Sequence, residues 1–152
     1  MKDDRKKWIY TTDVAVTTVQ DGKKFILLIR RAKDPHEGKL ALPGGHVETE
    51  HPDFGNSAKA AIRELREETC ISAPIHLLEL FAVLDGIGRD SRGPTMSAVY
   101  WLKASPLWLM AAKPQSDAGA VIIRELDRIQ PEEMAFDHFK IIELLLARGG
   151  RR

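Results

Sequence analysis

Alternating apolar and polar side chains near the start of the chain predict a β-hairpin. Residues 8–19 are rich in valine, isoleucine and threonine, and a second apolar run covers 25–29. Branched side chains favour extended backbone, and the intervening Asp21-Gly22 is a strong signal for a tight hairpin turn. The short apolar segment 40–42 predicts another strand, which the Pro-Gly-Gly sequence at 43–45 ends.

Farther along the chain, the pattern mixes helical and extended segments. A helix with Ser57 as its N-cap is predicted over 58–69, and a last helix over 136–148 ends at Gly149. The other predicted segments are strands at 77–84, 95–104 and 121–123 and loops at 46–56 and 85–94. This mixture does not fit a regular doubly wound parallel sheet. We therefore expect an α/β protein of the α+β type, in which helices cover a mixed β-sheet.

Length and composition fit a single domain over residues 1–152. The chain is 43% hydrophobic and 30% charged, and its 23 Lys and Arg against 22 Asp and Glu give a net charge of +1. Such a chain has neither the low hydrophobicity of a disordered protein nor the basic excess that nucleic acid or an anionic membrane attracts. We therefore expect neither of these as a partner.

No segment of the sequence resembles a membrane span or an export signal. The apolar stretch 98–112 is too short to cross a bilayer, and Lys103 and Pro106 interrupt it. The charged N-terminus has no apolar run like that of a signal peptide, so we expect a cytoplasmic protein. Cys70 is the only cysteine in the sequence, which excludes an intrachain disulfide and a cysteine-based zinc site. Its place beside Ile71 favours a packing role over a nucleophilic one.

The helix predicted over 58–69 has an apolar flank and an acidic flank. The apolar flank, which can pack on the sheet, consists of Ala58, Ala61, Ile62, Leu65 and Thr69. On the neighbouring flank Glu64 and Glu68 are four residues apart, with Glu67 beside them. Ionised carboxylates at this spacing repel each other by roughly a few tenths of a kcal/mol, and a bound dication would reverse the sign. The alternative is a solvated helix face on which Arg63 pairs with Glu67.

The glycine-rich turn before this helix fits the same chemistry. Mg²⁺ prefers carboxylate and carbonyl oxygens, water and substrate phosphates. Gly44 and Gly45 carry no side chain, so the turn could bring a bare carbonyl to an ion held by the acids. The joint pattern of strand, turn, loop and acidic helix favours a metal site over a solvated face.

Residues 42–71 resemble the Nudix box. The pattern of that family is a glycine, five residues, a glutamate, seven residues, and then Arg-Glu-aliphatic-any-Glu-Glu-any-Gly-aliphatic. Gly45 matches its first glycine, the run 63–69 matches its core as RELREET, and Ile71 matches its last aliphatic position. The resemblance implies one Nudix hydrolase domain over 1–152 with a Nudix-like α/β/α sandwich fold.

By this resemblance, Glu64, Glu67 and Glu68 hold one or more Mg²⁺ or Mn²⁺ ions, with the carbonyl of Gly44 as a further ligand. Arg63 orients the carboxylates and does not touch substrate, and it completes the expected catalytic set with the three glutamates. The implied reaction is hydrolysis of a diphosphate bond. The ion neutralises the diphosphate and lowers the pKa of the attacking water.

Two features depart from the family pattern. Cys70 replaces its glycine, which affects the turn that ends the helix, and the spacing between the first glycine and the arginine is four residues longer. Counting from either side places the isolated glutamate at His51 or at Gly55, and neither residue is acidic. Glu48 or Glu50 is expected to take its role, or to contact substrate, if the loop bulges. The sequence leaves the choice open.

The resemblance to ADP-ribose pyrophosphatase-like members extends beyond the box. The run 88–93, Gly-Arg-Asp-Ser-Arg-Gly, precedes a strand, and 134–138, Met-Ala-Phe-Asp-His, precedes the last helix, as in that group. Arg31 at a strand end and Arg89 are therefore expected to bind substrate, since guanidinium groups grip phosphates and stack on bases. A solubilising role for the loop arginine is the alternative.

One acid of the related proteins is missing. They often carry a glutamate, which assists the metal or the water, shortly after a position like Asp117, but here that stretch is Gly119-Ala120-Val121. Asp117, Glu125 or an acid within 85–90 is expected to replace it. The alternative is a weak catalyst.

Several apolar residues have two open interpretations. Trp8, Trp101 and Trp108 are candidates for stacking on adenine, although aromatic residues near strands more often pack in the core. The apolar run 107–110 fits a homodimer interface or core packing equally well.

The sequence thus predicts a metal-dependent hydrolase of a nucleoside-diphosphate small molecule, foremost ADP-ribose. One alternative is a pyrophosphohydrolase of modified nucleoside triphosphates such as 8-oxo-dGTP. The other is a nucleotide sensor, weakly catalytic or inactive, on the same fold. Regulators that resemble this group join such a domain to a DNA-binding domain, for which we expect no room after Phe136. The intact acidic helix favours the enzyme.

Overall fold

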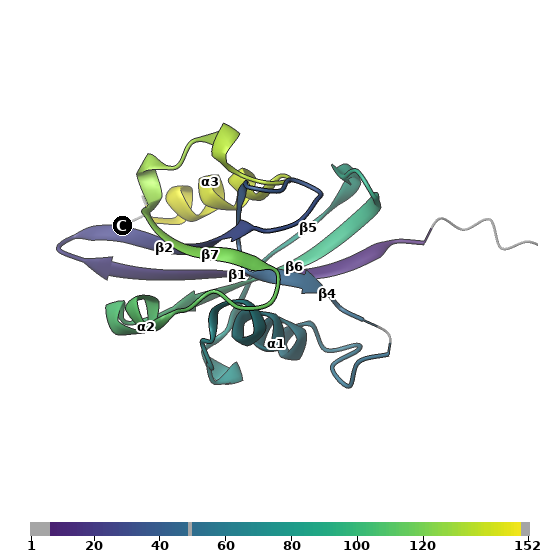
Figure 1. Cartoon of the computed structure of the whole chain (residues 1–152), viewed down its shortest axis with the longest axis horizontal. Coiled ribbons are helices and arrows are strands. Elements are labelled where there is room, and N and C mark those ends of the chain that lie inside the picture. The colour runs from purple at the N-terminus through teal and green to yellow at the C-terminus, as the bar shows by residue number, and fades with distance from the viewer. Residues whose placement is uncertain (1–6, 49, 150–152) are drawn as a thin grey trace, which may run out of the picture.

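The structure, a computed structural model, describes residues 7–48 and 50–149. Within these residues a seven-stranded sheet forms the centre of the molecule (Figure 1). Its main path runs β3-β2-β1-β6-β5, while β4 pairs with β1 and β7 pairs with β2. The strands are β1 (Ile9–Gln20), β2 (Lys23–Arg31), β3 (Leu40–Ala41), β4 (Gly44–His46), β5 (Glu79–Asp90), β6 (Gly93–Lys103) and β7 (Ala118–Glu125). The helices are α1 (Ser57–Thr69), α2 (Pro106–Ala111) and α3 (His138–Gly149), with short 3₁₀ turns at Ile75–Leu77, Leu126–Arg128 and Pro131–Glu133.

Helices cover both faces of the sheet. α1 and α2 lie on one face, and α3 lies on the other (Figure 1). Successive residues of a strand point to opposite faces, so β1 and β2 contribute to both cores. Ala15 and Ile26 pack in the cluster that contains α3, whereas Val14 and Leu27 pack in the cluster that contains α1. This arrangement confirms the expected α/β/α sandwich.

β1 and β2 form the predicted hairpin. They are antiparallel, and Gln20 faces Lys23 across a turn in which Asp21 and Gly22 have φ angles of 52° and 75°. Positive φ at both central residues is the geometry for which Asp-Gly is favoured. β1 also pairs in parallel with β6, so the sheet is mixed, as expected.

The prediction of a loop over 85–94 is wrong. β5 continues to Asp90 and β6 begins at Gly93, so the segment forms the end of a second hairpin. Its pairing is irregular between Gly86 and Asp90, and Gly88 has a φ of 87°. Glycines that usually mark a loop here mark an irregularity within a paired strand. The strand predicted at 40–42 ends at Ala41, before the Pro-Gly-Gly sequence as expected, and the two glycines then begin β4, which pairs with β1.

The ends of α1 also differ from the prediction. Its N-cap is Asn56, whose side chain accepts the backbone N–H of Lys59 at 3.0 Å, while the Ser57 hydroxyl hydrogen-bonds to Tyr100. Cys70 is exposed and does not pack in the core. It caps the helix with a φ of 61°, the left-handed conformation that glycine adopts more easily. The terminating turn is therefore kept without the family's glycine.

The apolar run 107–110 forms most of α2 and is divided between core and surface. Leu109 is buried, whereas Leu107 and Met110 are about three-quarters exposed, at 73% and 74%. Core packing therefore accounts for only part of the run, and the homodimer remains a prediction. In the described ranges, no helix is both long and apolar enough to cross a membrane.

Candidate active site

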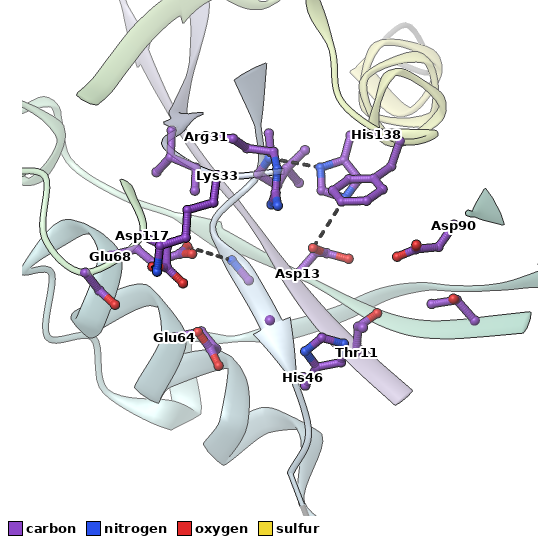
Figure 2. Close-up of a pocket in the computed structure, with 18 of the residues that line it drawn as sticks. Thr11, Asp13, Arg31, Lys33, His46, Glu64, Glu68, Asp90, Asp117 and His138 are labelled. Atoms are coloured by element: carbon purple, nitrogen blue, oxygen red, sulfur yellow. Dashed lines mark hydrogen bonds and ion pairs between the residues drawn. The ribbon is translucent and has the colours of Figure 1, made fainter. Parts of the chain in front are cut away.

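A polar cavity of about 340 Å³ opens between α1, β1, β4 and the start of α3 (Figure 2). Acidic side chains reach it from three elements: Glu64, Glu67 and Glu68 from α1, Asp13 from β1 and Asp90 from β5. Basic side chains, Arg31, Lys33 and Arg92, line it as well. The fold therefore brings acidic and basic side chains together around one cavity.

Glu68 is the most deeply buried acid of α1, at 7% exposure. Its Oε2 accepts the backbone N–H of Gly44 at 3.0 Å. Burial raises the pKa of Glu68 to about 8, and the charges of Glu64 and Asp13 act in the same direction, against the opposing effect of Gly44. Binding of a proton or a cation to this carboxylate therefore stabilises the site.

Gly45 permits the close contact between β4 and α1. A Cβ at this position would lie 2.6 Å from the carboxyl carbon of Glu64, a distance that no real side chain tolerates. Burial, together with Glu67 and Glu48, raises the pKa of Glu64, although Arg63 opposes this shift. The backbone of the turn therefore lies directly against the acids of the helix, as the glycine pattern predicts.

Arg63 is surrounded by oxygen acceptors and has a side chain only 10% exposed. Its Nε donates to Asp53 at 2.6 Å, and its Nη1 donates to Glu64 at 2.8 Å and to Glu67 at 3.2 Å. Its Nη2 donates to the carbonyl of His46 at 3.2 Å. Burial alone would lower the pKa of Arg63, but the hydrogen bonds to Asp53 and Glu64 raise it overall. This geometry matches an orienting role and not a solvated helix face.

The acid that Arg63 binds from the long loop is Asp53, which lies within the loop predicted over 46–56. Asp53 is 6% exposed, whereas Glu50 is exposed and does not line the cavity. Glu48 lines the cavity. The two counts of the box spacing gave His51 and Gly55, and Asp53 lies midway between them. This position between the two counts is the feature of the sequence that could have identified Asp53.

Arg89, which is expected to bind substrate, makes several contacts within the fold. Its Nε and Nη2 donate to both carboxylate oxygens of Asp137, at 2.7 and 2.9 Å, and its Nη1 donates to the carbonyl of Leu84 at 2.7 Å. This clamp ties the β5–β6 hairpin to the start of α3. Most of its donors are therefore used within the fold, although the residue lines the cavity.

Arg31 is better placed to meet a ligand. It lines the cavity, its Nε donates to the carbonyl of Pro35 at 2.7 Å, and its guanidinium lies 4.9 Å from the ring centre of Phe136. Arg92 approaches the same ring at 5.7 Å and pairs with Asp90. Burial and the neighbouring Arg92 lower the pKa of Arg31. An anion would relieve the repulsion between these two cations.

The candidates for the missing acid differ in whether they line the cavity. Asp117 lines the cavity, but it is 61% exposed and pairs with Lys33 at 2.6 Å. Glu125 pairs with Lys23 and Arg128, and Asp85 is exposed; neither of them lines the cavity, so neither is in place to replace the missing acid. Asp90 lies in the cavity wall, buried against Arg92.

None of the three tryptophans that were candidates for stacking on adenine lines the cavity. Trp8, Trp101 and Trp108 all lie outside the cavity lining, and Trp101 donates from Nε1 to Thr17 at 2.7 Å. The aromatic ring in the cavity is that of Phe136, which the sequence analysis noted only as part of a motif. His46, which the sequence analysis did not single out, and His138 of the same motif also line the cavity.

Comparison with known proteins identifies the family of this chain. A family model described as the NUDIX domain matches residues 10–145. The chain belongs to the Nudix family. An ADP-ribose pyrophosphatase of Methanocaldococcus jannaschii is 34% identical to this Nudix protein over 131 residues, which are 86% of this chain and 70% of that protein. The ADPR responsive transcriptional repressor NtrR of Acinetobacter baylyi is 30% identical over 147 residues, 97% of this chain but only 56% of the repressor. This chain therefore spans little more than half of the repressor's length.

Solved Nudix structures share the fold. The NUDIX domain of Shewanella oneidensis NrtR, complexed with ADP ribose, has a TM-score of 0.81 at 26% identity and covers 95% of this chain and 90% of that chain. A bifunctional NMN adenylyltransferase/ADP ribose pyrophosphatase of Francisella tularensis, complexed with AMP and a Mn ion, has a TM-score of 0.77 at 31% identity. The match covers 97% of this chain and 43% of the bifunctional protein.

The donor set of this Nudix cavity fits a hard divalent cation. Among the described residues, no three acidic, histidine or cysteine side chains converge as a ready-made metal cluster, because Arg63 engages Glu64 and Glu67. Mg²⁺, however, commonly binds through one or two carboxylates and keeps its other positions for water and substrate phosphates. The buried carboxylate of Glu68, which already favours a proton, would suit such a cation.

Proposed function

We propose that this Nudix protein hydrolyses the diphosphate bond of ADP-ribose or a closely similar nucleoside-diphosphate compound. The observation that carries this proposal is the cavity itself, which the acids of α1 line together with Arg31, Arg92 and Phe136. Acids suit a cation that binds a diphosphate, and two arginines beside an aromatic ring suit a nucleotide. Two relatives whose names include ADP-ribose, an enzyme and a repressor, support the same ligand class.

The residues of this chain have separate tasks in the proposed reaction. Mg²⁺ or Mn²⁺, when bound, supplies charge neutralisation and an activated water. Glu64 and Glu68, with Glu67 at the more exposed rim, would hold the ion, and the carbonyl of Gly44 is a further candidate ligand. Arg63 fixes the carboxylates through its contacts with Glu64 and Glu67.

Other residues that line the cavity would bind the rest of the substrate. Arg31 and Arg92 are placed for phosphate or ribose oxygens, and Phe136 offers a ring face or edge to a base or sugar. Glu48 lines the same cavity and is proposed as a polar contact to substrate. Arg89 contributes by holding the β5–β6 hairpin in place.

Chromatographic detection of AMP and ribose 5-phosphate after incubation with ADP-ribose and Mg²⁺ tests the activity. Glu64→Gln and Glu68→Gln should each lower turnover by about 100-fold or more, on the order of 3 kcal/mol in the barrier, with circular dichroism unchanged. Asp85→Asn, an exposed acid on β5 outside the cavity, is the matched control. Preferred cleavage of 8-oxo-dGTP would favour the triphosphate alternative, and no turnover of any diphosphate with Mg²⁺ or Mn²⁺ would refute the enzyme.

A nucleotide sensor is the second candidate, because one relative is a repressor named for its response to ADPR. Under this alternative ADP-ribose binds without turnover, and calorimetry should give the same affinity for the parent and for Glu68→Gln. Under the enzyme proposal, parent protein with Mg²⁺ consumes the ligand during the titration. The two outcomes exclude each other.

A further inference from the structure

Asp13 on β1 is a cavity acid that does not belong to the Nudix box. It is 6% exposed and lines the cavity, where His138 lies beside it (Figure 2). Within residues 7–48 and 50–149, no lysine or arginine forms an ion pair with Asp13, and the basic side chain in contact with it is that of His138. A carboxylate that is buried without a cationic partner is costly to remove from water. The fold therefore keeps a costly negative charge at this wall.

Two buried side chains fix the orientation of the Asp13 carboxylate. The Ser97 hydroxyl donates to its Oδ2, and Nε2 of His138 lies 3.5 Å from its Oδ1. Nδ1 of His138 accepts the backbone N–H of Leu42 at 3.1 Å, so the ring proton is on Nε2, which faces Asp13. Ser97 and His138 are 1% and 7% exposed. The carboxylate is thus held by donors that leave its charge uncompensated.

Gly44 brings Asp13 and Glu68 to the same place. The backbone N–H of Gly44 donates to Oε2 of Glu68, and a Cβ on Gly44 would lie 2.6 Å from Oδ1 of Asp13. Two buried carboxylates, one from a strand and one from a helix, therefore flank a residue that has no side chain to separate them.

We infer that Asp13 is a further carboxylate of the divalent-cation site, acting together with Glu68, and that His138 and Ser97 are its positioning residues. This inference rests on the proposed function. A dication compensates both buried charges at once, and hydrogen-bond donors behind a ligand carboxylate orient it toward the ion. Asp13 then supplies the acid that is absent at 119–121, from the opposite side of the site.

Mn²⁺ titration of the metal-free protein, followed by electron paramagnetic resonance, measures the effect without any turnover. Asp13→Asn keeps the shape and an acceptor for Ser97 but removes the charge, and it should weaken Mn²⁺ binding by about tenfold or more. Asp85→Asn should bind Mn²⁺ as the parent does. Asp117→Asn, at a cavity acid already paired with Lys33, should change the affinity much less than Asp13→Asn.

The positioning role has its own test. His138→Gln retains an acceptor for Leu42 and a donor for Asp13, so its Mn²⁺ affinity should stay near that of the parent. His138→Phe keeps the ring volume without either contact and should weaken Mn²⁺ binding by about tenfold. This contrast remains informative even if Asp13→Asn fails to fold, and equal affinities of the two His138 variants overturn the positioning role.

Different experimental results would overturn the inference about Asp13 and the proposed function. If Glu68→Gln loses Mn²⁺ while Asp13→Asn binds it as tightly as the parent, the inference is overturned and the proposed function stands. The same holds if Asp117→Asn, and not Asp13→Asn, loses the ion. If the parent itself binds no Mn²⁺ and hydrolyses no diphosphate, the proposed function is refuted.

Discussion

Replacing Glu68 with glutamine should change the pH dependence of stability in the metal-free protein. Burial raises the pKa of Glu68 to about 8 in the folded state, from an ordinary value of 4.5. The folded protein therefore binds this proton more tightly than the unfolded chain does. Its contribution to stability is fully present below about pH 4.5 and is lost as the pH rises through about 8.

The expected magnitude follows from the size of that pKa difference. At about 1.4 kcal/mol per pKa unit, ionisation of Glu68 costs the folded state on the order of 5 kcal/mol by pH 9. The side chain is only 7% exposed, so solvent screens little of this cost, and local relaxation reduces it to a few kcal/mol. Glutamine keeps the shape and can accept the Gly44 N–H without a charge. Glu68→Gln should therefore be about 2–5 kcal/mol more stable than the parent at pH 9 and nearly equal at pH 5.

Urea denaturation in EDTA at pH 5, 7 and 9 measures this difference. Addition of Mn²⁺ at pH 9 should stabilise the parent more than Glu68→Gln, because a ligand that binds only the folded state raises its stability. Asp85→Asn should follow the parent at every pH. Parallel pH profiles for the parent and Glu68→Gln would refute the account of Glu68 as a strained, buried carboxylate.

Three further substitutions test the structure. Cys70→Gly should raise the free energy of unfolding by about 1 kcal/mol in thermal denaturation, because Cys70 has a φ of 61° and glycine adopts this conformation freely; a less stable glycine variant would contradict this. Gly45→Ala should fold but lose about tenfold or more in turnover, since its Cβ would meet the Glu64 carboxyl at 2.6 Å; unchanged kinetics would argue that the contact does not matter. Arg89→Lys should lose about 1–3 kcal/mol of stability in urea, because lysine cannot reproduce the two-fold contact with Asp137. A large rise in KM at unchanged stability would instead return Arg89 to substrate binding.

Much of the fold followed from local signals. Asp21-Gly22 defined the first hairpin, since only a few residue pairs accept two positive φ angles. The period of the apolar residues in α1 located the helix and the flank that carries Glu64 and Glu68. Errors arose where local signals were ambiguous. Gly86 and Gly88 indicated a loop, but strand pairing with β6 overrode their preference.

The sequence by itself determined the acidic helix, the glycine turn and the family, because these depend on the spacing of neighbouring residues along the chain. Only the tertiary structure decided which acid of the long loop Arg63 binds, that Arg89 is held by Asp137, and that Asp13 reaches the cavity. Asp13 and His138 are far apart in sequence and 3.5 Å apart in space. Their contact depends on how strands and helices pack, and no local period encodes which buried charges that packing brings together.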